Sequence, residues 1–583
     1  MKPRLYSSDK FYWHQPATTR DFLILAVFIV VMTFQPYFLY AEINFFEMGL
    51  YLPGIDTVIK GGVPFRDVIH LRGVLELYFP ALFMSILGNN IAVLSLYFYV
   101  GTIVTMVAWL AVAGQLYITR YLLYLFTLVF VARTFPRVAF MNWGGFRFAF
   151  GAMAVLCMIY FFKRGKKVWM LWAGIMTAAS ALTSIEMGFC SVAGIGGALM
   201  FSYIFSLQDR KGLWKAFWFW ILGIMCLIVP FAVYLAVHGA LGLYLENVYT
   251  IVTQMQKVIP PDLYEGPSPR NIVQGFTALV TPTHKNFRHM TPTYLYIFLA
   301  IYFVIRARKK QLTIDDAKLV GVGVYGVMIY YLSFRWIWGS QFELALQPQK
   351  VLLFYLLEVV YLTLLALKHD LRQKLFQISG QFFTKAKLYG VYFLLVSLFM
   401  SSVGYAIDRY RKRFFVFQWA YRTLRGEDRS SLIPMNGQPS ERLHLPRIKF
   451  VTVPDWQAND CNLLVKFIEA NTKPDETVFM FPELAGYSYI IDRPFVGRFP
   501  MVTFSWFNDE WHREFVKELK NNPPRFAIVD KDPGESFSEV YFKAPGSTNR
   551  EKYDEVARFI EENYQVIDET PSLWICKNKN SPR

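Results

Sequence analysis

The stretch FEMGLYLPGIDTVIKGGVPFRD, residues 46–67, follows shortly after the first long apolar run of the chain, Phe22 to Tyr40. It is too polar to span a bilayer and too apolar for an ordinary surface loop, with glycines, prolines and several ionisable side chains in close succession. His70, Arg72 and Glu76 continue the series. Charged groups beside a membrane are costly, so this cluster predicts a functional site.

The composition around this stretch is that of a membrane protein. Hydrophobic residues make up 54% of the 583 positions and charged residues only 18%, whereas a soluble domain is nearer a quarter charged. The apolar residues also fall into blocks of roughly 17–25, which suits a hydrocarbon core of about 30 Å. The formal charge of +17 lies mostly in short loops between these blocks. That is the positive-inside pattern, and no nucleic-acid partner is expected.

We predict a polytopic α-helical protein with about eleven membrane spans. The predicted spans cover residues 21–40, 91–115, 119–134, 145–163, 167–184, 187–206, 214–238, 293–307, 317–335, 350–368 and 387–405. No small-residue cleavage site follows the first apolar run, so it is interpreted as a retained span and not as a signal peptide. With a cytoplasmic N-terminus, eleven spans place the Lys and Arg clusters at 163–167, 209–215, 306–310 and 368–387 in the cytoplasm, as the positive-inside rule requires.

Residues 74–88, VLELYFPALFMSILG, are apolar but too short for a comfortable span, and they contain Glu76 and Pro80. If they crossed the membrane, every later loop would change sides and the basic clusters would face outward. We therefore expect a juxtamembrane helix that lies at the membrane surface or dips into it. The first outer loop then extends over residues 41–90.

Residues 406–583 have the pattern of a small α/β domain outside the membrane, so the chain divides into a membrane domain, 1–405, and a C-terminal domain, 406–583. Short apolar runs bounded by turn residues predict strands, and two amphipathic stretches predict helices. The strand candidates are ETVFMF, YSYIID, RFAIVD and SLWICKN, and the helix candidates are WHREFVKELKNN and EKYDEVARFIEENY. Cys461 and Cys576 lie in this domain, and the sequence leaves open whether they pair.

Two groups of side chains are candidates for chemistry, although charges of an interfacial loop also pair with one another or with lipid headgroups, and basic side chains at helix ends snorkel to the interface. Carboxylates gather in the first outer loop, and Arg and Lys side chains, which suit phosphate recognition, occur on the same face. The sequence contains no P-loop, dinucleotide fingerprint, HExxH or CxxC motif, so nucleotide-driven transport and a dedicated zinc site are unsupported.

The opening stretch resembles the first extracytoplasmic loop of the C-type (GT-C) glycosyltransferase superfamily. This superfamily includes polyprenyl-phosphate-sugar-dependent enzymes related to protein O-mannosyltransferases and lipid A aminoarabinose transferases. The resemblance is carried by Glu47-Met48-Gly49-Leu50-Tyr51, then Gly62-Val63-Pro64-Phe65-Arg66-Asp67, then the apolar helix from Leu75 to Gly88. The C-terminal region similarly looks like the extracytoplasmic domain that many bacterial members carry.

The resemblance implies an enzyme of the bacterial inner (plasma) membrane, part of the cell-envelope machinery, with an extracytoplasmic C-terminal domain. Such an enzyme moves a sugar from a polyprenyl phosphate to a lipid, glycan or protein acceptor at the extracytoplasmic face, with inversion. A carboxylate serves as base, and basic side chains hold the leaving phosphate. The catalytic candidates are Glu47, Asp56 and Asp67, and the phosphate-binding candidates are Arg66, His70, Arg72, Arg137, Arg147, Lys257, Arg288 and Arg335.

This sequence departs from the family pattern in two places. Glu47 stands where an Asp is commoner, followed by Met48, and the loop at 135–144 contains no acid. A mechanism with two carboxylates is therefore not supported; no metal ligand is predicted, and a divalent cation is left open as a cofactor. The alternatives are a lipid-linked sugar flippase or other secondary transporter without transferase activity, for which internal repeats would be expected, and a non-catalytic sensor or scaffold.

Overall fold

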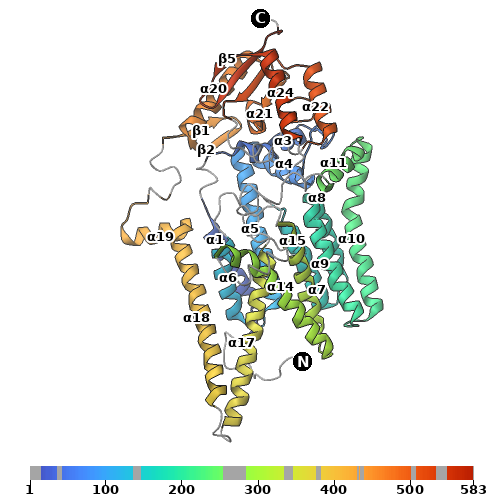
Figure 1. Ribbon diagram of the computed structural model, residues 1–583, viewed down its shortest axis with the longest axis vertical. Helices are drawn as coiled ribbons and strands as arrows, with labels where there is room; N and C mark the ends of the chain where they lie inside the picture. Colours follow the sequence, from blue (N-terminus) through green and yellow to red (C-terminus); the bar gives the residue numbers. More distant parts are fainter. Residues whose placement is uncertain are drawn as a thin grey trace.

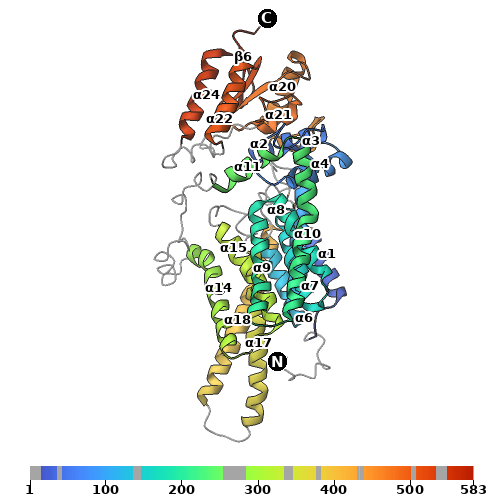
Figure 2. The ribbon, with the colours of Figure 1, turned by 90° about the vertical axis from the view of Figure 1, so that its right-hand side faces the viewer.

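The computed structural model describes residues 15–35, 42–134, 146–253, 284–333, 346–375, 382–429, 432, 439–500, 507–532 and 548–581. Most of this part of the chain is helical, and the long helices run side by side along the long axis of the molecule (Figures 1 and 2). The sheets lie together at one end of the helix bundle (Figure 1).

Each of the eleven predicted spans coincides with a helix. These helices are α1 (Thr19–Thr33), α5 (Ile91–Leu116), α6 (Arg120–Thr134), α7 (Ala149–Arg164), α8 (Val168–Thr183), α9 (Ile185–Ile204), α10 (Arg210–Val237), α14 (His284–Arg308), α15 (Ile314–Ser333), α17 (Gln347–Leu375) and α18 (Phe382–Arg413). Within the described residues, α5, α9 and α10 are long and apolar enough to cross a membrane on length and composition. The count of eleven crossings stays a prediction.

Glycine permits a very close contact between α8 and α10. A Cβ atom on Gly174 would lie 2.1 Å from the carbonyl oxygen of Trp220, and one on Gly223 would lie 2.1 Å from that of Leu171. Close backbone packing of this kind is combined with a hydrogen bond of 3.3 Å from the indole N–H of Trp220 on α10 to the hydroxyl of Thr177 on α8. Close packing at small residues and interhelical hydrogen bonds are how helices associate where lipid removes the hydrophobic drive.

The first outer loop forms three short helices between the bundle and the sheets: α2 (Phe45–Gly49), α3 (Leu52–Ile59) and α4 (Leu75–Leu87) (Figure 1). The helix α4 corresponds to the predicted juxtamembrane helix. Its Leu77, Ala81 and Met84 are buried, whereas Leu82 and Ile86 on another face are exposed. An exposed apolar stripe of this kind suits a membrane surface, and that location stays a prediction. After α10, the helix α11 (Leu241–Thr253) returns toward the same loop.

The C-terminal region contains two sheets. Strands β1 (Ser440–Leu445) and β2 (Ile448–Pro454) form an antiparallel pair. The second sheet has the order β3-β4-β6-β5, in which only the β3–β4 pair is parallel. The strands of this second sheet are β3 (Val478–Phe481), β4 (Phe526–Asp530), β5 (Tyr564–Glu569) and β6 (Leu573–Asn578). The described helices that accompany the two sheets are α20 (Asp455–Asn471), α21 (Ala485–Ile491), α22 (Asp509–Asn521) and α24 (Asn549–Asn563).

The secondary-structure predictions for this region are confirmed with one exception. Strands β3, β4 and β6 and helices α22 and α24 lie where the sequence predicts them. The predicted strand YSYIID is wrong, because it forms α21, in which all seven residues are buried. A run that is apolar on every side lacks the periodicity that distinguishes a buried helix from a buried strand.

The course of the chain after α18 bears on the predicted division at residue 405, which stays a prediction. The helix α18 continues to Arg413, and a separate helix, α19 (Phe415–Arg425), follows it before the first strand.

The sequence left open whether Cys461 and Cys576 pair. Both are free, buried thiols in the structure.

Candidate active site

Glu47 lies in the first turn of α2 and is held there by its own helix cap. The side chain of Asn44 accepts a hydrogen bond from the backbone N–H of Glu47, at 3.0 Å. The Glu47 side chain is only 7% exposed, and among the described residues its Oε2 atom has no hydrogen-bond partner. Burial raises the pKa of the Glu47 carboxyl from its ordinary 4.5 to about 7, against an opposing effect of the Arg72 guanidinium. A buried carboxyl with a free oxygen and a pKa near neutrality suits a proton acceptor.

The helix that carries Glu47 is fixed by the C-terminal region. The amide of Gln457 on α20 makes two hydrogen bonds of 2.8 Å with the backbone of Ile43, donating to its carbonyl and accepting from its N–H. The rings of Phe45 and Tyr487 have their centroids 4.0 Å apart. We call this contact between α2 and the α20–α21 pair the α2 dock.

Two glycines set the closeness of the α2 dock. A Cβ atom on Gly49 would lie 2.8 Å from the backbone nitrogen of Gly486, and one on Gly486 would lie 2.8 Å from the carbonyl oxygen of Phe45. Both distances are below normal van der Waals contact with backbone atoms, so neither position accepts a larger residue without moving a helix.

A chain of alternating charges leads from Glu47 into the helix bundle. Arg72 lies over the Tyr51 ring, 5.1 Å from its centroid, and interacts electrostatically with Glu47, Glu76 and Arg147. Its Nη1 is 3.5 Å from Glu76 Oε2. Arg147 Nη2 in turn lies 3.1 Å from an oxygen of Glu186, the second residue of α9. The structure therefore brings together one candidate base, Glu47, and two candidate phosphate-binding residues, Arg72 and Arg147.

A backbone contact positions Arg72 in this chain. The N–H of the next residue, Gly73, donates to the carbonyl of Thr183 at 3.0 Å, and a Cβ on Gly73 would lie 2.0 Å from the carbonyl oxygen of Leu182. Only glycine allows the loop to lie this close to the end of α8. This contact brings the loop beside α9, which carries Glu186.

Two carboxylates of this chain of charges, Glu76 and Glu186, are absent from the predicted site residues. Both are paired with an arginine, and Glu76 is buried with its pKa raised by burial. Two signals were available in the sequence. Glu76 stands four residues after Arg72 on an otherwise apolar helix, the spacing of a helical ion pair, and Glu186 follows directly on a small-residue span.

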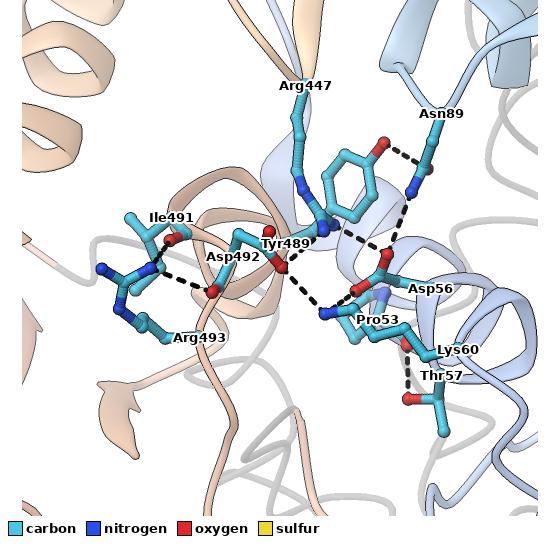
Figure 3. A network of polar contacts seen from close by, with 10 residues as sticks. All are labelled: Pro53, Asp56, Thr57, Lys60, Asn89, Arg447, Tyr489, Ile491, Asp492 and Arg493. Atoms are coloured by element: carbon cyan, nitrogen blue, oxygen red, sulfur yellow. Dashed lines mark hydrogen bonds and ion pairs between the residues drawn. The ribbon is translucent and has the colours of Figure 1, made fainter. Parts of the chain in front are cut away.

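Asp56 takes part in a different network, which joins α3 to the C-terminal region (Figure 3). Its oxygens lie 2.8 Å from Arg447 Nη1 and 2.9 Å from Lys60 Nζ, and one accepts a 3.0 Å hydrogen bond from Asn89. Lys60 and Arg447 also pair with Asp492, which ends α21. The oxygens of Asp56 are therefore already occupied, unlike Oε2 of Glu47.

Asp67 closes a tight turn. It accepts hydrogen bonds from the backbone N–H of Val63, at 2.7 Å, and from two nitrogens of Arg66, each at 2.8 Å. Within the turn Phe65 has a φ of 71°, a left-handed conformation that is rare for an aromatic residue. Arg498 secures the same segment by donating to the Phe65 carbonyl at 3.0 Å.

The remaining phosphate-binding candidates divide into two groups. His70 is buried, and burial lowers the pKa of its imidazole to about 4, so it is neutral at pH 7, with no partner for Nε2 among the described residues. Arg66 is paired with Asp67 and exposed. Arg137, Lys257 and Arg335 lie outside the described residues, and Arg288 lies in α14 at a position whose side chain is not described.

The described residues contain no group of three or more His, Cys, Asp or Glu side chains arranged to hold a metal ion. Among the described residues the candidate site comprises one buried carboxyl, two arginines with their paired glutamates, and the ring of Tyr51.

Comparison with known proteins finds likeness in structure and none in sequence. No protein-family model and no curated protein matches this chain. The crystal structure of ArnT from Cupriavidus metallidurans bound to undecaprenyl phosphate superposes with a TM-score of 0.50 at 11% identity, covering 96% of this chain and 98% of ArnT. The apo structure of the same ArnT gives 0.51 at 10% identity, with the same coverage.

The chain shares its fold with ArnT. The resemblance inferred from residues 46–88 is therefore confirmed at the level of the fold, and at this identity the likeness concerns the fold alone.

The α2 dock yields a prediction about stability. Gly486→Ala should separate α21 from α2 and lower the free energy of unfolding by about 1–3 kcal/mol, the usual cost of overpacking. Hydrogen exchange should show faster exchange at residues 43–49. The matched control is Gly196→Ala, because a Cβ there meets no atom within 4 Å. Equal protection of residues 43–49 in both variants would contradict the contact.

The environment of Glu47 yields a second prediction. Since its pKa is raised in the folded protein, the folded state binds more protons than the unfolded state between about pH 4.5 and 7. The ionised carboxyl therefore destabilises the fold increasingly through that window. Glu47→Gln should stabilise the protein above pH 7, by at most about 3 kcal/mol, and the difference should vanish below pH 4.5. Thermal unfolding of both proteins across this pH range tests the sign.

Proposed function

We propose that this protein is an integral membrane glycosyltransferase that moves a sugar from a polyprenyl-phosphate donor to an acceptor at the extracytoplasmic face. The proposal is supported chiefly by the buried Glu47 carboxyl, which has an oxygen without a hydrogen-bond partner among the described residues, a pKa of about 7 and an electrostatic interaction with the Arg72 guanidinium. This pair lies in a fold shared with ArnT, whose crystal structure contains undecaprenyl phosphate.

In the proposed reaction the acceptor oxygen or nitrogen attacks the anomeric carbon from the face opposite the phosphate, so the configuration inverts. The Glu47 carboxylate takes the proton of the acceptor as the new bond forms. The bond between the anomeric carbon and the phosphate oxygen breaks, and its electron pair stays on the lipid phosphate. A carboxylate with a pKa near the working pH is well matched to this role.

Arg72 and Arg147 are assigned to the phosphate. The leaving phosphate gains charge as the bond breaks, and guanidinium groups already in place stabilise that charge without reorganising. The phosphate leaves as a weak base, so no acid is needed to protonate it, and one carboxylate is sufficient. Glu76 and Glu186 balance the buried positive charge of the two arginines when no donor is bound.

The other predicted site residues are assigned weaker or different roles in the proposal. Asp56 and Asp67 rank behind Glu47 as bases because cations and backbone groups already occupy their oxygens. His70 is a neutral hydrogen-bonding group and not a cation at pH 7. Arg66, Arg137, Lys257, Arg288 and Arg335 remain proposed phosphate ligands.

The proposal includes the location of the protein. The chain is assigned to the bacterial inner membrane, with a cytoplasmic N-terminus, a membrane domain at 1–405 and an extracytoplasmic domain at 406–583. The acceptor is a lipid, a glycan or a protein. A divalent cation is the one cofactor that the scheme leaves open, and dialysis against EDTA followed by an activity measurement decides its part.

Transfer by the purified protein is the direct test. The full chain in nanodiscs, supplied with polyprenyl-phosphate sugars and a cell-envelope extract as acceptor, should release free polyprenyl phosphate and glycosylate a component of the extract. Glu47→Gln should reduce kcat by roughly 10²–10⁴-fold, the usual loss on removing a general base. The matched control is Glu510→Gln, an exposed position on α22, which should retain full activity.

The alternative function gives the opposite result in the same system. A flippase would carry the lipid-linked sugar across a vesicle membrane without any acceptor, would release no polyprenyl phosphate, and would not depend on the carboxyl of Glu47. That combination would reject the transferase.

The pH profile tests the identity of the base separately. Since the base must be ionised, kcat/KM should rise with pH through about 7, the pKa of Glu47 in the free protein. The residual activity of Glu47→Gln should lose this limb. A limb that persists unchanged in Glu47→Gln would move the assignment to another group.

A further inference from the structure

The helix α19 follows α18 directly and turns away from its axis, at the end of α18 nearest the sheets (Figure 1). None of its eleven residues is buried. It is nonetheless firmly attached to the bundle at its start. Phe414, at the junction, is fully buried against Tyr410, with ring centroids 4.5 Å apart, and the Phe415 ring lies 6.1 Å from Phe34 at the end of α1.

The sequence of α19, FVFQWAYRTLR, is strongly amphipathic. At 100° per residue, Val416, Phe417, Ala420 and Leu424 share one side of the helix, and Gln418, Arg422 and Arg425 share the other. The C-terminal half of the apolar side is uncovered, since Ala420 is exposed and Leu424 is 88% exposed, whereas Val416 and Phe417 nearer the bundle are half-buried. Trp419, which lies between the two sides, is 46% exposed.

This apolar side continues a surface that already faces lipid in the proposed arrangement. On α18, Phe393, Val396, Met400 and Ile407 are exposed at the spacing of one helical stripe. On α1, exposed apolar residues form a second stripe that ends at Phe34, the neighbour of Phe415; they are Leu23, Val27, Val30, Val31 and Phe34. The exposed side of α19 therefore begins where two apolar stripes end.

The charge around α19 has a consistent sign. Between Asp408 and Arg429 the sequence contains seven basic and three acidic side chains. Asp408 pairs with Arg411 and Lys412, and Glu427 pairs with Arg425. The remaining excess is basic. It includes Arg429, which lies 5.6 Å over the Trp419 ring. An Arg stacked on Trp at the polar edge of an apolar helix face is typical of a membrane interface, where aromatic rings lie at headgroup level.

We propose that α19 is an interfacial anchor, which lies in the headgroup layer of the membrane with Leu424 in the acyl region and Trp419 at headgroup level, and which binds anionic phospholipid headgroups through Arg422, Arg425 and Arg429. The anchor sets the height at which the chain leaves the bundle toward β1. It is independent of the proposed transferase activity, because it requires only that the bundle is embedded in a bilayer.

A fluorescent probe at position 424 tests the anchor in the full chain. Among the native thiols only Cys226 is exposed, so Cys226→Ser provides the background. In this background Leu424→Cys carries a polarity-sensitive bimane label, and the protein is reconstituted in phosphatidylcholine vesicles with or without phosphatidylglycerol. The matched control is Leu463→Cys on α20, which is also an exposed leucine but belongs to the sheet region.

The label at 424 should emit at shorter wavelength than the label at 463, and brominated phosphatidylcholine should quench most of its emission while leaving the label at 463 bright. Phosphatidylglycerol should increase the quenching at 424, and the double variant Arg422→Gln, Arg425→Gln should lose that increase. An unquenched label at 424 that aqueous iodide reaches would overturn the proposal. So would a label shielded from both quenchers, which would indicate a second copy or a protein partner on this face.

Discussion

The geometry of the candidate site depends on the α2 dock. A five-residue helix is far too short to be stable alone, and α2 is no exception. Its position is fixed from outside, by two hydrogen bonds of Gln457 to the Ile43 backbone and by the glycine contact at Gly49 and Gly486. These contacts hold Glu47 in a place where its carboxyl is buried and one oxygen stays free. The C-terminal region therefore helps to position the candidate site.

The site also shows how a protein keeps charge near a membrane at tolerable cost. Arginines and carboxylates alternate from Glu47 through Arg72, Glu76 and Arg147 to Glu186, so each buried charge has an opposite neighbour. The end of this series is the exception. Glu47 interacts electrostatically with Arg72, but among the described residues one of its oxygens has no hydrogen-bond partner, and desolvation has the largest effect on its pKa. The same desolvation that disfavours the ionised form provides a proton acceptor near neutral pH.

Much of this was accessible from the sequence, because length and periodicity are local properties. All eleven predicted spans coincide with helices, and α4 was separated from them by its length and by Glu76 and Pro80. The fold expected from residues 46–88 was likewise confirmed. The predicted strand at residues 487–492 was wrong, because the buried run that forms α21 lacks the periodicity that distinguishes a helix from a strand. The sequence analysis did not predict that Glu76 and Glu186 pair with the site arginines, or that Asp56 forms an ion pair with Arg447. The Arg147–Glu186 and Asp56–Arg447 pairs join residues far apart in the chain, and one sequence does not reveal such pairs. The Arg72–Glu76 pair is local, and its spacing was visible in the sequence.

The residues joined by the α2 dock are separated by most of the protein, with Ile43 and Gln457 being 414 positions apart. A ribosome therefore completes the loop that bears Glu47 long before it makes the surface on which that loop rests. During this interval the loop lacks its support, and the carboxyl is open to water. A nascent or prematurely terminated chain thus has every residue of the first loop but not the environment that tunes Glu47, and the site matures only when synthesis has passed α21.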